Sequence, residues 1–188
     1  MNHERPQRKS PRRPLFDYRS MGRYFVTPVV QGRLQLFGAV VDGVMVANDA
    51  GKMVLEWWAK LPSKFARVEL GAFTVMPNHF HGVIILNGTL ERDPPSLSDV
   101  MGWFMTMTTN AYIRGVKASG WRRFDGRLWQ RSFHDHIIRR RGSFARITTY
   151  IEENPKRWTL DRENDTRAGE DEFDRWLLED AANEDSDE

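Results

Sequence analysis

The sequence of 188 residues contains no cysteine. This absence excludes disulfides, thiolate metal ligands and cysteine nucleophiles, and it fits a cytoplasmic protein. No apolar run approaches the roughly 20 residues that a membrane-spanning helix needs, and the opening MNHERPQRKSPRRP lacks the apolar stretch of a secretory signal. We therefore expect a protein without a membrane anchor, in which any metal ion is held by histidine, carboxylate, amide or water ligands.

Acidic side chains are scarce at the N-terminal end of the chain, and basic side chains are scarce at the C-terminal end. Residues 1–23 carry seven basic and two acidic side chains, whereas residues 161–188 carry three basic and thirteen acidic ones. Between them, the stretch 114–157 carries twelve basic and four acidic side chains. A basic body favours a polyanionic partner, most often nucleic acid. Arginines that merely solvate helix faces would give the same composition.

Alternating apolar residues and turn signals predict a mixture of strands and helices. We expect strands at residues 22–30, 66–76, 79–86 and 127–140, and a hairpin within 36–48 around Asp42-Gly43. We expect helices at residues 48–61, 96–120, 142–155 and 170–182. This order favours a ferredoxin-like α+β sandwich, with an antiparallel central sheet and helices on its face.

Composition divides the chain into three parts. Residues 1–20 are rich in proline and arginine and are expected to form a basic flexible arm. Residues 21–160 are expected to form one domain, and residues 161–188 an acidic C-terminal tail with a short helix. We expect this tail to be a solvated appendage; masking of a basic DNA surface is the alternative.

The segment VMPNHFHGVIIL, residues 75–86, is an apolar strand that contains two histidines. Residues two apart on a strand share a face, so His79 and His81 project together while Phe80 points the other way into the core. Two neutral imidazoles side by side are a ready pair of metal ligands. The alternative is that both are ordinary polar residues satisfied by nearby hydrogen bonds.

A second segment, TTYIEENP, places a tyrosine and an asparagine on one helix face. Tyr150 and Asn154 are four residues apart, so one lies above the other. A phenol can act as a nucleophile with the help of a cation or base, and an amide oxygen is a hard ligand suited to Mg²⁺ or Mn²⁺. With His79 and His81, Asn154 would give three protein ligands. Taken alone, each residue is also common on an ordinary amphipathic helix.

The ordered set VMPNHFHGVIIL, LWQRSFHDHIIR and YIEENPKRW resembles the REP-associated tyrosine transposases. These are single-tyrosine HUH endonucleases related to the IS200-like transposases of small insertion sequences. The resemblance spans about residues 16–160 and leaves the acidic end outside it. It implies a ferredoxin-like fold whose central sheet carries the histidine pair.

The resemblance also implies a reaction. Tyr150 would attack a phosphodiester of single-stranded DNA, forming a 5′-phosphotyrosine link and freeing a 3′-hydroxyl that can later rejoin strands. His79, His81 and Asn154 would hold Mg²⁺ or Mn²⁺. The implied substrates are palindromic hairpins with a short guide sequence beside them. The implied state is a monomer, with a homodimer left open.

Basic and aromatic side chains in and near the same stretch are candidates for DNA contact. Several arginines and one lysine of this stretch could contact backbone phosphates. Trp121, Trp129 and Phe133 could stack on unpaired bases unless they are buried. The N-terminal Arg5, Arg8, Lys9, Arg12 and Arg13 could enter a groove of a hairpin or merely aid solubility. The phosphate-contacting candidates are Arg122, Arg123, Arg127, Arg131, Arg139, Arg140, Lys156 and Arg157.

Two alternatives keep part of this interpretation. If residues 79–86 and 128–139 were neighbouring strands, His134 and His136 could join the first pair in a four-histidine zinc site of a hydrolase without a covalent intermediate. Alternatively, the protein could bind DNA hairpins without cutting them. In either case Tyr150 would not be a nucleophile.

Overall fold

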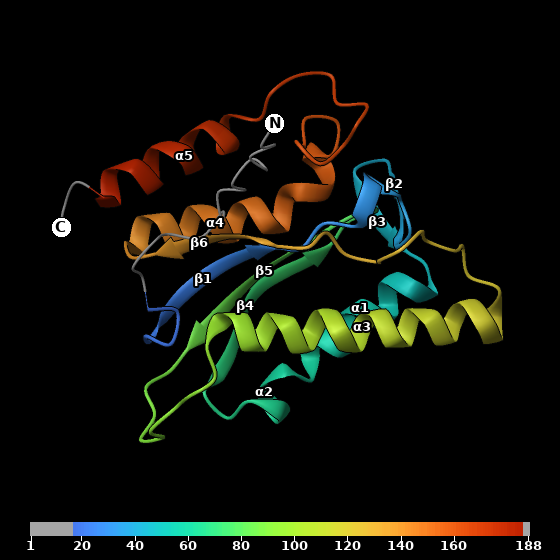
Figure 1. Ribbon diagram of the computed structural model, residues 1–188. Helices are drawn as coiled ribbons and strands as arrows, with labels where there is room; N and C mark the ends of the chain where they lie inside the picture. Colours follow the sequence, from blue (N-terminus) through green and yellow to red (C-terminus); the bar gives the residue numbers. More distant parts are fainter. Residues whose placement is uncertain (1–16, 186–188) are drawn as a thin grey trace, which may run out of the picture.

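The computed structural model describes residues 17–185, and within them a four-stranded antiparallel sheet forms the centre (Figure 1). The strand order is β4-β5-β1-β6. The bounds are Gly22–Thr27 for β1, Val68–Val75 for β4, Phe80–Leu86 for β5 and His134–Ile138 for β6. Helices connect β1 to β4 and β5 to β6. This is the order and connectivity of a ferredoxin-like sheet, which confirms the predicted fold class.

One face of the sheet is covered by α1 (Asp49–Ala59) and α3 (Leu97–Ser119), which lie side by side (Figure 1). The core on this face is aromatic: the Phe80 ring lies 4.6 Å from the Trp58 ring and 5.8 Å from the Phe104 ring, centre to centre. Phe80 has no solvent exposure. The residue between the two histidines is therefore a core residue, as the strand pattern predicts.

The other face is covered by α4 (Arg141–Glu153), with α5 (Glu172–Asp185) beyond it near β6 (Figure 1). A second apolar cluster lies here and includes Phe25, Val83, Ile147, Tyr150 and Phe173. Helices thus cover both faces of the sheet. The alternation along β5 sends Phe80 to the α3 side and its neighbours to the α4 side.

Local sequence signals set where the long helices begin. The Asn48 side chain accepts a hydrogen bond of 2.9 Å from the Gly51 amide at the start of α1. Ser96 and Asp99 exchange hydrogen bonds in a capping box at the start of α3, and such caps typically contribute about 1 kcal/mol. Gly120 ends α3 with a positive φ of 66°, a conformation that favours glycine.

The predicted hairpin is present as a separate two-stranded sheet. Strands β2 (Gly38–Val41) and β3 (Val44–Ala47) are joined by Asp42 and Gly43. Both turn residues have positive φ, 50° and 74°. This is the two-residue turn whose twist matches that of the flanking strands.

Two regions differ from the predicted layout. The expected strand at 127–140 is shorter, because β6 begins at His134 and residues 128–130 instead bond to the segment after β1. The segment after residue 160 is not a solvated appendage, because Asp161, Phe173 and Asp180 are buried against the domain. The expected basic arm lies almost wholly outside the described residues. No helix in the described part is long and apolar enough to cross a membrane.

We predict that Phe80→Ala lowers the free energy of unfolding by about 3–5 kcal/mol, because it removes a fully buried ring and leaves a cavity. Urea denaturation followed by tryptophan fluorescence measures this change. Phe73→Ala is the matched control, since Phe73 lies in the same aromatic group but is 43% exposed. Equal losses in the two variants would contradict the assignment of Phe80 to the core.

Candidate metal and tyrosine site

The histidine pair lies at the start of β5, on the α4 side of the sheet. His79 immediately precedes the strand and pairs with Val29, which follows β1. The Nε2 atoms of His79 and His81 lie 3.0 Å apart, and both side chains are buried. The strand therefore brings two imidazole nitrogens to one point.

A carboxylate completes a three-residue group. The Oδ2 atom of Asp161 lies 3.6 Å from Nε2 of His79 and 3.8 Å from Nε2 of His81. The candidate ligand atoms of the three residues all lie within 4.8 Å of one another. Two imidazoles and one carboxylate are ligands that divalent cations accept, so this group could hold a metal ion.

Further hydrogen bonds fix the orientation of both imidazole rings. Nδ1 of His79 lies 2.9 Å from Oδ1 of Asn78, and Nδ1 of His81 lies 2.8 Å from Oγ1 of Thr27. Because an amide oxygen only accepts, His79 donates from Nδ1, and the lone pair of its Nε2 faces Nε2 of His81. Such outer partners orient metal ligands in known sites.

Electrostatics favour a neutral His79 imidazole and an ionised Asp161 carboxylate. Burial lowers the pKa of His79 to about 3, against an opposing effect of Asp161. Burial alone would raise the pKa of Asp161, but the imidazoles of His79 and His81 and the amide of Asn154 outweigh it and lower that pKa below its ordinary value. Metal binding requires these same protonation states.

Asn154, predicted to be the third ligand, lies next to Asp161. Its Nδ2 donates a hydrogen bond of 3.0 Å to Oδ2 of Asp161. Its Oδ1 is buried and has no hydrogen-bond partner among the described residues. A buried amide oxygen without a donor is costly unless something else satisfies it, and a cation would do so.

Tyr150 lies on the same side of the sheet as the histidines. Its ring centre is 5.4 Å from that of His81 and 6.3 Å from that of Phe25. α4 carries the tyrosine, and apolar residues of that helix, including Ile147 and Ile151, pack in the cluster on this face. The structure thus brings Tyr150 and Asn154 close to the histidine pair, the arrangement that the resemblance implies.

The tyrosine is covered by the acidic segment. The ring of Phe173 stacks on that of Tyr150 with centres 3.6 Å apart and planes 5° apart, which leaves Tyr150 3% exposed. Burial raises the pKa of Tyr150 well above its ordinary value, and the nearby carboxylates of Asp161, Asp174 and Asp171 add to the effect. The phenol is therefore protonated at neutral pH.

The predicted DNA-contacting residues fall into separate groups. Arg122, Arg123, Arg127 and Arg131 are exposed on the connection between α3 and β6, and Arg139 and Arg140 are exposed on the one between β6 and α4. Lys156 follows α4 and lies beside the hairpin turn at Gly43. Arg157 is held by a two-pronged ion pair with Asp171 at 2.9 and 2.7 Å.

The aromatic candidates for base stacking are mostly core residues. Trp129 and Phe133 are buried, and Trp121 packs with its ring centre 5.3 Å from that of Tyr112. Their suggested stacking on unpaired bases is therefore wrong for Trp129 and Phe133 in this conformation. The N-terminal Arg5, Arg8, Lys9, Arg12 and Arg13 lie outside the described residues.

The four-histidine alternative required two strands to be neighbours, and they are not. β1 lies between β5 and β6. His136 instead lies 3.1 Å from Oδ2 of Asp180 on α5. Within the described part of the chain, the candidate metal group contains neither His134 nor His136.

Sequence reasoning missed Asp161, Asn78 and Thr27. Asp161 opens the acidic segment, 80 residues after His81, and nothing in its local sequence distinguishes it from the carboxylates around it. Asn78 directly precedes the first histidine, and nothing in its local sequence marks it as the partner of the His79 Nδ1 atom. Pairing across the sheet brings Thr27 to His81, and that register is not visible in either segment alone.

Comparison with solved structures defines the class of fold. The structure of a REP-associated tyrosine transposase bound to a REP hairpin aligns with a TM-score of 0.50 and 22% identity, over 71% of this chain and 66% of that chain. The chain therefore has the fold of a REP-associated tyrosine transposase, as the sequence motifs indicate. No model of a known protein family matches the sequence.

An uncharacterized protein of Haemophilus influenzae is a relative of this chain. It is 32% identical over 168 residues, which cover 82% of this chain and 92% of the Haemophilus protein. The chain belongs to the same protein family as this relative.

We predict that His81→Ala abolishes Mn²⁺ binding and that Asp161→Asn weakens it strongly, since each removes a candidate ligand. Asn78→Ala is expected to weaken binding by roughly 10- to 100-fold, the range typical for loss of an outer partner. Isothermal titration with Mn²⁺ measures these affinities.

The matched control for this titration is His134→Gln, which changes a histidine outside the group. It should leave the affinity for Mn²⁺ unchanged. A strong loss in this variant would show that the ion does not bind at the group of His79, His81 and Asp161.

Proposed function

We propose that this protein is a metal-dependent single-stranded DNA endonuclease and strand-transferase that acts on hairpin DNA through Tyr150. The observation that carries the proposal is the placement of the Tyr150 ring 5.4 Å from His81, beside the buried group of two histidines and one aspartate. The fold supports the proposal. A solved structure with this fold is that of a REP-associated tyrosine transposase bound to a REP hairpin.

The proposed chemistry balances without a further reactant. The Tyr150 oxygen attacks phosphorus, forming a bond to a 5′-phosphate while the bond to the 3′ oxygen breaks. The phenol loses one proton, and the departing 3′ oxygen gains one, so the step neither consumes nor releases a proton overall. The phosphotyrosine keeps the phosphodiester energy, so a 3′-hydroxyl can reverse the attack and join strands.

Each residue of the site then has a role. His79, His81 and Asp161 would hold Mg²⁺ or Mn²⁺, with Asn154 either orienting Asp161 or offering its own oxygen. A bound cation supplies charge stabilisation to the phosphate oxygens in such reactions. The exposed arginines between α3 and α4, with Lys156, would contact the DNA backbone and position the strand.

A non-catalytic hairpin-binding protein would need the basic surface but not this site. Such a protein would have no use for a buried imidazole pair whose orientation is fixed by Asn78 and Thr27. Maintaining buried polar groups is costly, so this arrangement favours catalysis.

We predict that the protein forms a covalent adduct with labelled hairpin DNA that carries single-stranded flanks, in the presence of Mn²⁺. Tyr150→Phe should lose the adduct completely, because it lacks the attacking oxygen, and chelator should have the same effect. A denaturing gel detects the adduct. Tyr112→Phe is the control: its hydroxyl bonds to the Arg122 carbonyl on the opposite side of the sheet, so adduct formation should persist. Cleavage by Tyr150→Phe would disprove the nucleophile assignment.

We also predict that Phe173→Ala speeds adduct formation by roughly two- to tenfold. A stacked aromatic pair contributes about 0.5–1.5 kcal/mol, and DNA must displace this ring to reach Tyr150. Initial rates on the same gel measure the change. Leu178→Ala on the same helix is the control, since Leu178 is 73% exposed. An unchanged rate in Phe173→Ala would show that the stacking does not limit access.

A further inference from the structure

An apolar pocket lies at the C-terminal end of α3, on the face of the sheet opposite the metal group. Its volume is about 270 Å³, and its lining consists of Ile113, Val116 and Phe124 with Lys117 and Arg123. Ile113 is a large apolar residue and is 37% exposed. The described residues therefore leave an apolar hollow open to water, with two cations beside it.

The chain that returns from α3 makes this pocket a firm part of the fold. The Trp121 ring packs on Gly115 so closely that no Cβ atom would fit there. The Tyr112 hydroxyl donates a hydrogen bond of 2.8 Å to the Arg122 carbonyl, and the Phe124 ring centre lies 5.6 Å from that of Tyr112. These contacts hold the returning chain against the helix, so the hollow between them has a fixed shape.

Positive charge surrounds the pocket. Residues 113–127 contain five basic side chains and one acidic side chain. Within the part of the chain that the structure describes, none of the five forms an ion pair. Unpaired cations beside an apolar hollow suit a partner that carries both acidic and large apolar side chains. The five basic residues are Arg114, Lys117, Arg122, Arg123 and Arg127.

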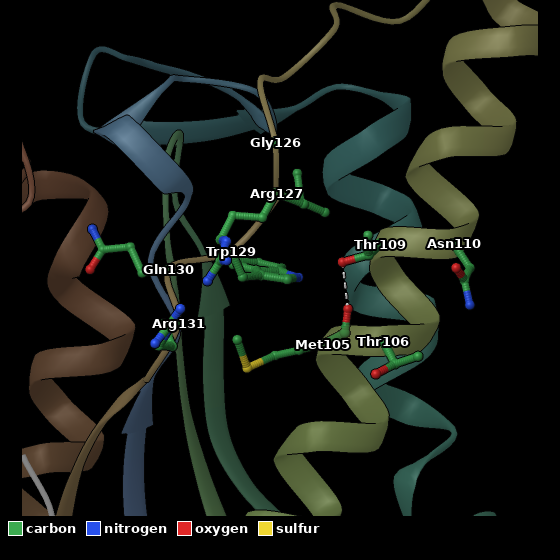
Figure 2. A pocket seen from close by; sticks show the side chains of 10 residues that line it. Met105, Thr106, Thr109, Asn110, Gly126, Arg127, Trp129, Gln130 and Arg131 are labelled. Carbon is green, nitrogen blue, oxygen red and sulfur yellow. Dashed lines mark hydrogen bonds between the residues drawn. The ribbon is translucent and has the colours of Figure 1, made fainter. Parts of the chain in front are cut away.

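The larger pocket between α3 and residues 126–131, of about 470 Å³, has a different character (Figure 2). Thr106, Asn110 and Gln130 give it polar walls, and the Trp129 ring that lines it is buried in the core. Among its lining residues, none is a large apolar side chain that is exposed. An apolar partner is therefore expected at the end of α3 and not in this larger pocket.

A segment with the required chemistry is present in the chain itself. Residues 172–188, which include α5, carry eight acidic side chains and one basic side chain. Leu178 on this helix is 73% exposed. The adjacent Glu179 is also exposed and has no ion pair among the described residues. The helix thus presents a large apolar side chain beside a free carboxylate.

α5 cannot reach the pocket of its own chain. Phe173 stacks on Tyr150, and Asp180 accepts a hydrogen bond of 2.9 Å from Ser143 at the start of α4. These contacts dock α5 on the face of the sheet opposite α3. In Figure 1 the yellow C-terminal end of α3 and the red α5 also lie at opposite ends of the molecule. A contact between α5 and the pocket therefore joins two copies.

Other exposed apolar side chains match the pocket less well. Val41, Val44 and Val46 are exposed on the β2–β3 hairpin, but residues 38–47 contain a single acidic side chain. Leu90 is followed by two acidic residues and one basic residue within residues 91–93. Neither segment approaches the negative charge of α5 and the residues after it. Charge complementarity therefore selects α5 as the occupant.

We propose that the pocket at the C-terminal end of α3 receives Leu178 from α5 of a second copy of this chain, with Glu179 near Lys117 and Arg123. Because each copy contributes a different surface, repetition of the contact builds a chain of copies or closes into a ring. The contact is small, so its dissociation constant is expected between about 1 µM and 1 mM. At submicromolar protein the copies are separate, so the contact does not alter the rates of adduct formation.

Sedimentation velocity of the whole chain, without DNA or metal, tests the proposal. Association should grow with protein concentration and weaken in about 1 M salt, where the screening length falls to about 3 Å. Leu178→Asp should weaken association by roughly tenfold or more, because it removes the apolar anchor. Lys117→Glu should have a similar effect, because it opposes Glu179 with a like charge. A wild-type chain that stays monomeric throughout this concentration range would overturn the inference.

The matched control is Arg131→Glu, which reverses one charge in the separate pocket of Figure 2. Arg131 is exposed, as Lys117 is. This variant should associate as the wild type does. Equal loss in Arg131→Glu and Lys117→Glu would show that association depends only on net charge, and it would overturn the pairing of α5 with the pocket.

A mixture of two variants tests the pairing directly. Leu178→Asp keeps the pocket and loses the helix contact, whereas Lys117→Glu keeps the helix contact and loses the pocket. Each should associate poorly alone. Together they should form a complex of one copy of each and nothing larger, which also shows that both variants are folded. Absence of this mixed complex would overturn the proposal.

Exchange of the two charges provides a rescue. Lys117→Glu combined with Glu179→Lys in one chain should recover the association that Lys117→Glu loses, because the opposite charges then face each other again. No recovery would contradict the proposed neighbours. If Lys117→Glu weakens binding of hairpin DNA while the wild-type chain never associates, the basic surface serves DNA alone and the inference is wrong.

Discussion

The contact of one carboxylate with two buried imidazoles organises this molecule. Asp161 satisfies the histidines electrostatically, accepts a hydrogen bond from Asn154 and holds the end of the chain against the sheet. Removal of any member would leave an unpaired polar group in a place that water does not reach, which is costly. The site is thus both a candidate for chemistry and a structural junction between the domain and its acidic segment.

Side chains on the two sides of the sheet at β5 have different roles. Phe80 joins the aromatic core formed with α1 and α3, and this core anchors the strand. His79 and His81 face the layer made by α4 and the C-terminal segment. The sheet supports the histidine pair from below, and this layer covers it. Phe173 stacked on Tyr150 is part of that cover.

Features encoded within a short span of sequence were predictable, and features that depend on distant contacts were not. The His79–His81 face, the Asp42-Gly43 turn and the Ser96 cap each follow from neighbours along the chain. Asp161 could not be distinguished from the surrounding carboxylates, because its role depends on a fold that returns it to residues 80 positions earlier. The charge of residues 161–188 indicated solvation, but burial of Asp171 and Asp180 against Arg157 and His136 overrides composition.

The bonds of Glu163 and its neighbours to the N-terminal half have a practical consequence. Asn78 donates to the Glu163 carbonyl at 2.7 Å, and Arg33 pairs with the Glu163 carboxylate at 3.1 Å. A chain trimmed at residue 160, where the composition changes abruptly, would lack the candidate ligand Asp161 and the Glu163 carbonyl that orients the Asn78 amide beside His79. The shortened protein would have a damaged site, and a loss of metal or DNA binding in it would say nothing about the whole chain.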